Sequence, residues 1–371
     1  MRVLLANSEA LMRGGEFQTA ALARALMRSG WDVMLAARAG SALSRAASGS
    51  IPCEEFGFEG VPVITPFAVA RLVSRWRADL LHAQTSSAHT HLWLARGLLR
   101  GAPPLVVSRR VAFPIGKDLF SLLKYRTGVA HYIPISRAAA GSLLARGVNA
   151  SRMTIIPSGV DIEAIRRARA STGLERRWGI EKGSCVIGVV AAFEAEKGHR
   201  ILLRAAAGVL RESPDARFIL VGEGSLERGL RHEIAALDIE GAVKCVPPDV
   251  PLEEMLPLFD IFVLPSLQEG LSTALIAAMA AGLAVIASDT GGIPEVITPG
   301  SGLLVPPGDD AALAGAIQRL IADEKLRKSM GAAARIRGAD FDMSRSVERI
   351  MEVYRHLLGR GEGPSRHESS P

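Results

Sequence analysis

Short apolar runs alternate with amphipathic segments along nearly the whole chain, and this alternation is the feature that most restricts its fold. The first apolar run, Arg2 to Ala6, leads through a glycine pair into a helical pattern at Glu16 to Ser29. Gly30 closes that pattern, and a second apolar run covers Trp31 to Ala37. This order of strand, helix and strand predicts a βαβ unit, so we expect a parallel sheet with helices on its faces.

The alternation forms two series. In the first, more strands are expected at residues 78–83, 104–108, 131–136 and 153–158, with helices at Thr90 to Leu99 and Arg137 to Arg146. A charged stretch with helical spacing, residues 161–184, interrupts the pattern. In the second series, strands are expected at CVIGVV, RFIL, VKCV, DIFVLP and LAVIAS, with helices beginning near Gly198, Ser225, Leu252 and Ser272.

Two series in 371 residues predict two domains, since a single core rarely grows that large. We expect an α/β protein with two Rossmann-like, doubly wound parallel sheets, in domains at residues 1–162 and 180–340. The charged stretch could bridge them. A helix at about 344–358 has room to pack back across the first domain, and residues 359–371 are expected to be disordered.

The cysteines and the N-terminus favour a reducing, cytoplasmic location. Cys53, Cys185 and Cys245 are widely separated and form no CxxC pair, so neither a disulfide framework nor a zinc site is expected. The first apolar run is too short for a signal peptide. The uncharged stretch from Gly270 to Ser288 resembles a membrane span, but its small residues favour a helix that ends at Gly282 and a buried strand.

Charge is distributed unevenly. Residues 1–160 hold 19 Lys and Arg against 8 Asp and Glu, a formal charge of +11, which leaves 25 against 30, or −5, for the remainder. A basic half suits nucleic acid, anionic lipid or a phosphorylated acceptor, and it also serves solubility alone.

Two places could bind a ligand at the carboxyl ends of strands, where helix N-termini offer free N–H groups. At Gly14 and Gly15, directly before Glu16, the missing side chains let the backbone approach a phosphate or an acceptor. An ordinary turn between a strand and a helix would have the same sequence and is the alternative. The chain has neither a GxGxxG fingerprint nor a GxxxxGK[ST] loop, which argues against NAD binding and P-loop hydrolysis.

The second place is PSLQEGLSTALIAAMAAG, residues 265–282, where Glu269 stands between a strand and a helix. The N–H groups of Gly270, Leu271 and Ser272 could bind a diphosphate, while Glu269 accepts hydrogen bonds from sugar hydroxyls. A carboxylate beside a phosphate site is otherwise unfavourable, so a purely structural role for Glu269 is the weaker reading.

This segment and the IASDTGGIPEVI that follows it resemble the donor-binding signature of the family 4 glycosyltransferases, retaining enzymes of the GT-B fold. The glycine pair, IIPSGVD at residues 155–161, EKGH at 196–199, LVGEG at 220–224 and DIFVLPS extend the resemblance over most of the chain. It implies two facing domains, the first for the acceptor and the second for a nucleotide-diphosphate sugar, with no metal or other cofactor.

The resemblance also implies roles for individual residues. Lys197 neutralises the donor diphosphate, Glu269 contacts the transferred sugar, and the loop from Pro247 to Val250 lies near the base. Gly15 joins the donor-binding candidates, and Gly14 and Glu16 the acceptor-side candidates. A solvated lysine at a helix start is the structural alternative for Lys197.

Three positions depart from the family pattern. Ala277 replaces a second glutamate that contacts ribose, and Ala192 replaces an arginine at the diphosphate. Arg110 stands at about the position of a family histidine, after PLVVS. Arg109 and Arg110 could supply the charge lost at position 192, although two surface arginines after an edge strand are the alternative.

Two other groups of residues have spacings that resemble metal-binding motifs. His82, His89 and His91 are closely spaced but lack a nearby cysteine or carboxylate, so zinc is not expected. His89 is kept as an acceptor-side candidate beside Arg109, although a core or helix-start role fits a histidine of this kind better. The DFD at 340–342 precedes a terminal helix, so Asp342 is predicted to be a helix cap.

The sequence therefore predicts a retaining, metal-independent glycosyltransferase that uses a lipid-linked or saccharide acceptor. We expect it in surface polysaccharide or lipopolysaccharide assembly, in contact with an anionic membrane face and not with nucleic acid. A non-catalytic relative, prompted by Ala192 and Ala277, and a nucleotide-sugar epimerase are the alternatives. Base, sugar, linkage and oligomeric state stay open.

Overall fold

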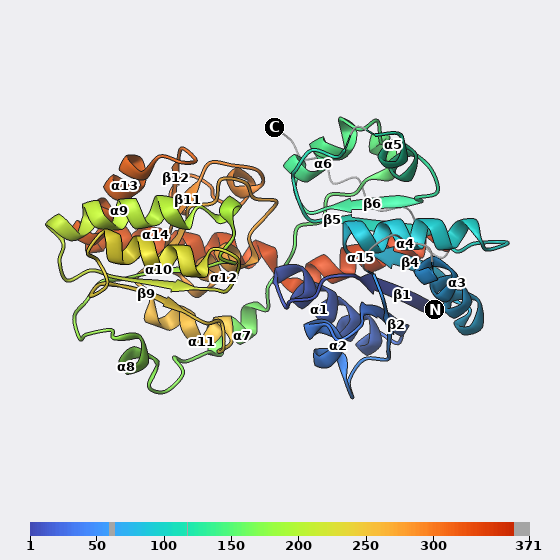
Figure 1. Ribbon diagram of the computed structural model, residues 1–371, viewed down its shortest axis with the longest axis horizontal. Coiled ribbons are helices and arrows are strands. Elements are labelled where there is room, and N and C mark those ends of the chain that lie inside the picture. The colour runs from blue at the N-terminus through green and yellow to red at the C-terminus, as the bar shows by residue number, and fades with distance from the viewer. Residues whose placement is uncertain (59–63, 117, 360–371) are drawn as a thin grey trace. The chain divides into compact units, whose positions relative to one another are not determined.

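The computed structural model describes residues 1–58, 64–116 and 118–359, which form two units (Figure 1). Unit 1 comprises Met1–Ser158 and the segment that begins at Ser344, and unit 2 comprises Gly159–Met343. Each unit contains one six-stranded sheet in which every pair of neighbouring strands is parallel.

The sheet of unit 1 has the order β3-β2-β1-β4-β5-β6. Its strands are β1 (Arg2–Asn7), β2 (Asp32–Arg38), β3 (Cys53–Phe56), β4 (Leu80–Ala83), β5 (Leu105–Arg109) and β6 (His131–Pro134). Its helices are α1 (Gly14–Arg28), α2 (Ala42–Ala47), α3 (Ile64–Trp76), α4 (Ser86–Gly97), α5 (Leu119–Arg126), α6 (Arg137–Leu144) and α15 (Met343–Leu357).

Alternate residues of the unit 1 strands face opposite sides of the sheet. Leu4, Leu81 and Val107 point toward α3 and α4 and share an apolar core with them. His82 points to the other side, where it contacts Tyr354 of α15. The last helix therefore completes the second face of unit 1, as the sequence predicts for residues 344–358.

The sheet of unit 2 has the order β12-β11-β10-β7-β8-β9. Its strands are β7 (Val186–Val190), β8 (Arg217–Val221), β9 (Val243–Val246), β10 (Ile261–Leu264), β11 (Ala284–Ser288) and β12 (Leu303–Val305). Its α-helices are α7 (Ile162–Arg167), α8 (Leu174–Trp178), α9 (His199–Glu212), α10 (Glu227–Ala236), α11 (Leu252–Met255), α12 (Thr273–Ala281), α13 (Asp310–Ala322) and α14 (Glu324–Gly338).

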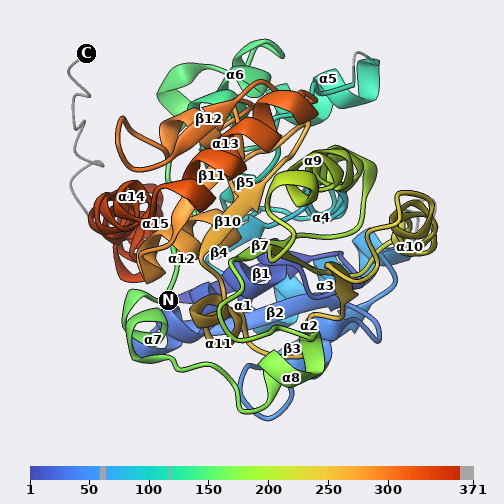
Figure 2. The same ribbon diagram turned by 90° about the vertical axis from the view of Figure 1, so that its left-hand side faces the viewer.

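The strands of unit 2 are apolar on both sides because helices cover both faces of the sheet. On one face α9 and α13 pack side by side (Figure 2) and share a core with α10. Elsewhere α12 packs on α14, and Trp178 of α8 stacks on Phe259. Residues 161–184 thus belong to the packing of unit 2 and are more than a bridge.

Some local expectations are wrong or incomplete. Residues 153–158 form no strand; Thr154 and Ile156 bond to β6 on one side, and Pro157 has no N–H to continue. Helix α4 starts earlier than predicted because Thr85 caps it through the Ala88 N–H. The predicted stop of α12 at Gly282 is confirmed by its φ of 88°.

Three further expectations concern the ends of the chain and the membrane. Asp342 directly precedes α15, and its capping role stays a prediction. Of the tail predicted to be disordered, residues 360–371 lie outside the described residues. No helix in the described ranges is both long and apolar enough to cross a bilayer.

Two helix-interior glycines offer a test of the packing in unit 2. A Cβ at Gly331 of α14 would collide with the carbonyl oxygen of Gly282, whereas a Cβ at Gly315 of α13 would meet open space. We expect Gly331→Ala to lower the free energy of unfolding by about 1–3 kcal/mol through overpacking. Gly315→Ala should raise it by about 0.5–1 kcal/mol, because alanine favours the helix. Urea unfolding measures both, and equal signs would contradict this packing.

Candidate functional site

The loop that joins β10 to α12, residues 265–272, lies at the carboxyl end of the unit 2 sheet and is here called the donor loop. Its carboxylate, Glu269, forms an ion pair with Lys197, with Nζ 2.7 Å from Oε2. Ser266 Oγ donates to the same oxygen at 3.3 Å. The side chains of Lys197 and Glu269 are only 22% and 10% exposed, so water screens the pair less than it screens a surface pair. The structure thus brings together the two residues that the sequence predicts at the diphosphate and the sugar.

Two glycines with positive φ fix the donor loop. Gly198, at φ 69°, follows Lys197, and a Cβ there would collide with the carbonyl oxygen of Pro265. Gly291, at φ 57°, lies against the carbonyl oxygen of Glu269 in the same way. Any larger residue would push these segments apart, so the glycines set the position of the ion pair.

Main-chain bonds add to this fixation. Leu267 N–H donates to the carbonyl of Glu196 at 2.8 Å, and Thr290 Oγ1 donates to the carbonyl of Leu267 at 3.1 Å. The donor loop is therefore held by the segment before α9 on one side and by the segment after β11 on the other. A loop tied at several points can present its N–H groups without first becoming ordered.

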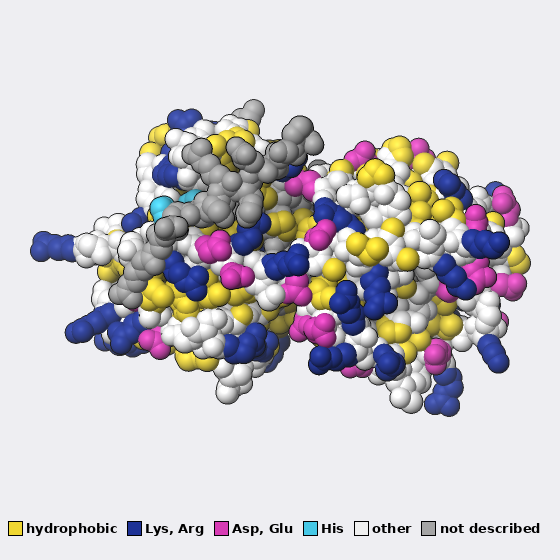
Figure 3. Space-filling model, turned by 180° about the vertical axis from the view of Figure 1, so that it is seen from behind, with side chains coloured by type: hydrophobic (Ala, Val, Ile, Leu, Met, Phe, Trp, Pro, Cys, Tyr) yellow, Lys and Arg dark blue, Asp and Glu magenta, His cyan; other side chains and the backbone are white. Residues whose placement is uncertain are grey.

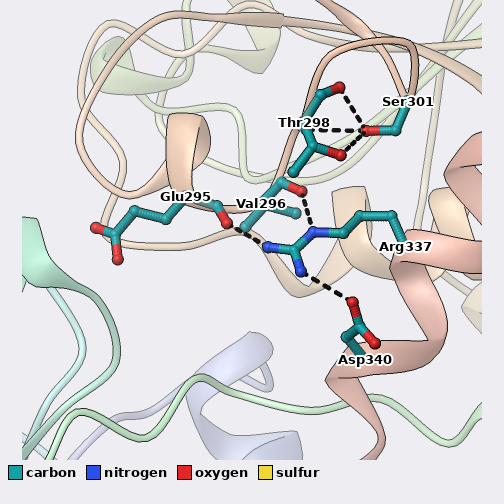
Figure 4. A network of polar contacts seen from close by, with 6 residues as sticks. All are labelled: Glu295, Val296, Thr298, Ser301, Arg337 and Asp340. Carbon is teal, nitrogen blue, oxygen red and sulfur yellow. Dashed lines mark hydrogen bonds and ion pairs between the residues drawn. The ribbon is translucent and has the colours of Figure 1, made fainter. Parts of the chain in front are cut away.

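The segment after β11 is itself anchored from behind by Arg337 of α14 (Figure 4). Its guanidinium donates to the carbonyl of Val296 at 3.0 Å and to that of Glu295 at 2.7 Å, and it pairs with Asp340 at 2.9 Å. The arginine thus satisfies carbonyls at the end of a short 3₁₀ turn (Ile293–Glu295). No spacing in the sequence points to this support.

Helix α12 begins directly behind Glu269. Ser272 is its N-cap and accepts from the Leu275 N–H at 3.2 Å. Among the described residues, no acceptor lies on the N–H groups of Gly270, Leu271 or Ser272. The positive end of the α12 dipole and these free donors form a place for an anion.

Among the described residues, the departures from the family pattern leave Lys197 as the cation bonded to the donor loop. The carbonyl of Ala192 accepts from His199 Nε2 at 2.9 Å, and no described arginine contacts the Lys197–Glu269 pair in its place. Ala277 is 1% exposed and belongs to the apolar packing of α12, so it presents no polar group to a ligand. The pair itself has no net charge, which leaves the helix N-terminus as the main electropositive element.

The expected base loop, Pro247 to Val250, follows β9 at one edge of the sheet. Asp249 pairs there with Arg177 at 2.7 Å, and the loop is largely exposed. Strands β7 and β8 separate it from β10, a span of about 14 Å at the usual strand spacing. Both loops nevertheless end parallel strands and so open at the same edge.

In unit 1 the carboxyl ends of β1, β4 and β5 surround Arg110. Its guanidinium donates to Gln84 Oε1 at 2.6 Å and to Ser158 Oγ at 3.3 Å, and its buried Nε has no partner among the described residues. Burial lowers the pKa of Arg110 to about 10, so it stays cationic at neutral pH. A cation whose hydrogen-bond partners are neutral can attract an anion, although the nearby Glu16 carboxylate offsets part of its charge.

Arg110 is oriented by a chain of hydrogen bonds that reaches α15. Gln84 Nε2 donates to His82 Nδ1 at 3.0 Å, and the Tyr354 hydroxyl donates to the same nitrogen at 2.5 Å. His82 Nε2–H then donates to Ser108 Oγ at 2.9 Å. Burial lowers the pKa of His82 to about 3, which keeps the ring neutral, so that the single lone pair of Nδ1 is shared by the two donors.

The glycine pair forms the first turn of α1, two residues earlier than predicted. The N–H groups of Gly14 and Gly15 have no acceptor among the described residues, and Gly15 lies beside Arg110, whose Cδ would be 3.5 Å from a Cβ there. Glu16 accepts from Asn7 Nδ2 at 3.0 Å and from the Arg13 N–H at 3.1 Å. Since both of its oxygens are occupied, Glu16 fixes the start of α1 and is not a free acceptor-side group.

Two other acceptor-side candidates are placed differently from the prediction. His89 is fully buried, with its ring edge-on to Tyr125 and Tyr132 at ring distances of 5.0 and 6.3 Å, so it is a core residue. Arg109 donates to Ser142 Oγ and to the carbonyl of Phe113, away from the partners of Arg110. Adjacent strand residues face opposite sides, so the two arginines do not act together.

Sequence reasoning missed the residues that orient the candidates. Asn7 and Gln84 directly follow buried strand residues, and polar groups at strand ends are a usable signal. Tyr354 lies on a helix far along the chain, and no spacing points to it. In the ranges that the structure describes, no group of His, Cys, Asp and Glu is arranged to hold a metal ion.

Two family models match the chain. Glycosyl transferases group 1 matches residues 172–337, and Glycosyltransferase Family 4 matches residues 12–164. The first match contains Lys197 and Glu269, and the second contains Gly15 and Arg110. The two candidate sites thus fall within the matched segments.

Curated relatives of the chain are named as glycosyltransferases. The chain is 32% identical over 221 residues to a D-inositol 3-phosphate glycosyltransferase of Corynebacterium jeikeium, covering 56% of this chain and 52% of that protein. It is 31% identical over 235 residues to the amylovoran biosynthesis glycosyltransferase AmsK of Erwinia amylovora, covering 61% and 56%. The matched segments span about half the length of these relatives.

A solved structure supports the fold. Anabaena Alr3699/HepE in complex with UDP-glucose matches with a TM-score of 0.84 and 21% identity, over 96% of this chain and 100% of that one. Together with the two parallel sheets, this match confirms the predicted GT-B fold.

The buried histidine predicts a pH dependence of stability. In the unfolded chain His82 is protonated below about pH 6.5, whereas in the folded protein its pKa is about 3. The unfolded state therefore binds one more proton between these pH values, and the stability of the folded state falls as the pH falls through this window. Between about pH 7 and 5 we expect His82 to account for a loss of about 2 kcal/mol.

Urea unfolding of the wild type and of His82→Gln at both pH values measures this loss. Glutamine keeps a hydrogen-bonding group but cannot be protonated, so the variant should lose about 2 kcal/mol less. An identical pH dependence in the two proteins would show that His82 is accessible to protons in the folded state.

Proposed function

Because the chain belongs to the family 4 glycosyltransferases, we propose that it transfers a sugar from a nucleotide-diphosphate sugar, with retention of configuration and without a metal ion. The observation that carries the proposal is the Lys197–Glu269 pair at 2.7 Å, beside the free N–H groups that open α12. This combination offers donors to a diphosphate and a carboxylate to sugar hydroxyls within one loop.

In the proposed reaction, the bond between the anomeric carbon and the diphosphate oxygen breaks, and the acceptor hydroxyl oxygen bonds to that carbon. The acceptor proton passes to the departing diphosphate. Lys197 and the N-terminus of α12 stabilise the charge that develops on the leaving group. Glu269 holds hydroxyls of the transferred sugar, so that the anomeric carbon is oriented for attack.

We place the acceptor on unit 1, where Arg110 and the Gly14 and Gly15 N–H groups offer donors to an anion. A relative named for D-inositol 3-phosphate supports an acceptor that carries a phosphate. The Arg110 position favours the same chemistry, since its guanidinium bonds to an amide oxygen and a hydroxyl and not to a carboxylate.

The cellular role that we propose is assembly of a surface polysaccharide or lipopolysaccharide from a lipid-linked or saccharide acceptor. A relative in amylovoran biosynthesis supports the polysaccharide half of this proposal. The +11 charge of residues 1–160 supports an anionic acceptor at the cytoplasmic face of a membrane.

The donor is identified by a calorimetric and thermal-shift screen against UDP-, GDP-, ADP- and CMP-sugars in EDTA, starting with UDP-glucose. We expect one nucleotide to bind, and Lys197→Ala and Glu269→Ala each to weaken it by about 10–100-fold, since each removes a charged hydrogen bond. Lys328→Ala, which breaks an exposed ion pair with Glu324 on α14, is the matched control and should bind normally.

The same screen separates the alternatives. Binding with transfer to an acceptor supports the proposal, and conversion of the donor without an acceptor would favour an epimerase. If no donor binds at millimolar concentration while the protein remains folded, Ala192 and Ala277 have removed the donor site and a non-catalytic role follows. EDTA that abolishes activity would overturn the metal-independent mechanism.

Two substitutions of Arg110 test whether its charge and its planar shape each contribute to acceptor binding. We expect Arg110→Ala to lower kcat/KM for a phosphorylated acceptor by about 10–100-fold, with Arg110→Lys intermediate because a point charge replaces a planar fork. Arg24→Ala, which changes an exposed arginine on α1, is the control. Unchanged kinetics in Arg110→Ala would show that Arg110 only holds Gln84 and Ser158 together.

A further inference from the structure

Unit 1 exposes large apolar side chains on α5 and its surroundings. The apolar patch consists of Phe113, Leu119, Phe120, Leu123 and Leu144, which are 37–70% exposed. Leu119 and Leu123 are one helical turn apart and share one face of α5. Contiguous apolar surface on a soluble protein usually marks a contact with a partner or a membrane.

Hydrogen bonds hold the end of α6 against α5. Arg146 donates to the carbonyl of Asp118 at 2.9 Å, at the start of α5. Arg126, at the end of α5, donates to the carbonyl of Arg146 at 3.2 Å. Leu144, two residues before Arg146, therefore belongs to the same surface as the α5 side chains.

The opposite side of α5 is firmly anchored on α4. Lys124 Nζ donates to Thr90 Oγ1 at 3.0 Å and to the carbonyl of Ser86 at 3.3 Å, and Phe120 packs edge-on against Trp93 at 5.7 Å. Because these bonds hold the inner side of the helix in place, Leu119 and Leu123 cannot turn inward. Their exposure is a fixed property of the fold.

The segment of the chain that carries the patch is rich in cations and poor in acids. Residues 80–160 hold 10 Lys and Arg against the single acid Asp118, or +9, whereas residues 1–79 hold 9 against 7, or +2. Arg100, Arg126 and Arg137 are exposed in this segment. Figure 3 shows Lys and Arg side chains around the rim of unit 1 on the face that it presents.

We propose that the apolar patch inserts into the surface of an anionic lipid bilayer, with the exposed Arg100, Arg126 and Arg137 on the headgroups. This inference rests on the proposed membrane-face function and names the surface that would carry it. Apolar side chains beside cations, with almost no acid, match an interface of acyl chains below phosphates. A protein partner that covered only the apolar side chains would not need cations beside them, whereas an anionic lipid surface does.

Vesicle sedimentation tests the proposal with the full chain. The probes are vesicles of phosphatidylcholine alone and of phosphatidylcholine mixed with phosphatidylglycerol. We expect binding only to the mixed vesicles, weakened by salt, and reduced by about tenfold or more in the double variant Leu119→Ser/Leu123→Ser. Ile336→Ser, which removes a 78% exposed isoleucine from α14, is the control and should bind as the wild type does.

A second measurement does not depend on loss of binding. In the Leu119→Trp variant, the fluorescence of the introduced tryptophan should be quenched by brominated acyl chains in the mixed vesicles. This quenching reports insertion directly. Donor binding without vesicles, measured on every variant, shows that unit 2 is intact and tests the proposed reaction separately. If donor binding fails, the vesicle result still tests the membrane proposal. If vesicle binding fails, donor binding still tests the proposed reaction.

Two outcomes would overturn the proposal. If the double variant binds mixed vesicles as well as the wild type does, the contact surface lies elsewhere. If the wild type binds neither kind of vesicle, the patch has no membrane role. A change in the oligomeric state of the double variant would then assign the patch to a contact with a second copy of the chain.

Discussion

The donor site of unit 2 depends on a steric constraint more than on any single bond. Gly198 and Gly291 bring two segments so close to the donor loop that a Cβ at either position would strike a carbonyl oxygen. This close approach puts Lys197 within 2.7 Å of Glu269 and leaves both partly shielded. Charge and geometry at this edge follow from the absence of two side chains.

The two candidate sites offer different groups to an anion. Unit 2 offers a helix N-terminus and a cation already paired with a carboxylate, so its edge carries little net charge. Unit 1 offers a buried cation held only by an amide and a hydroxyl. The loss of an arginine at position 192 and the gain of Arg110 move positive charge from one unit to the other.

The sequence predicts the fold well because apolar runs, glycine stops and strand-end motifs are local signals. Both sheets except their edge strands β3 and β12, the stop at Gly282 and the return of the last helix follow from such signals. The errors have physical reasons: residues 153–158 are apolar but lie along only one side of β6, and His89 faces the core although it opens a helix near the ligand edge.

The arrangement within the site is harder to foresee. Lys197 and Glu269 could be named from motifs, since each follows a strand of the same sheet. The bonds that orient Arg110 could not, because Gln84, His82 and Tyr354 meet only after strands and a distant helix have assembled. Separate roles for Arg109 and Arg110 likewise depend on which face of β5 each side chain takes.

The path of the chain has a consequence for biosynthesis. Unit 2 is one continuous segment, Gly159–Met343, whereas unit 1 needs α15, which leaves the ribosome after all of unit 2. Until then Trp31 and His82 lack Tyr354, their partner on α15. Domains generally fold in order of synthesis. Here the first unit to emerge is the last to be completed, so its open face must be protected while unit 2 is being translated.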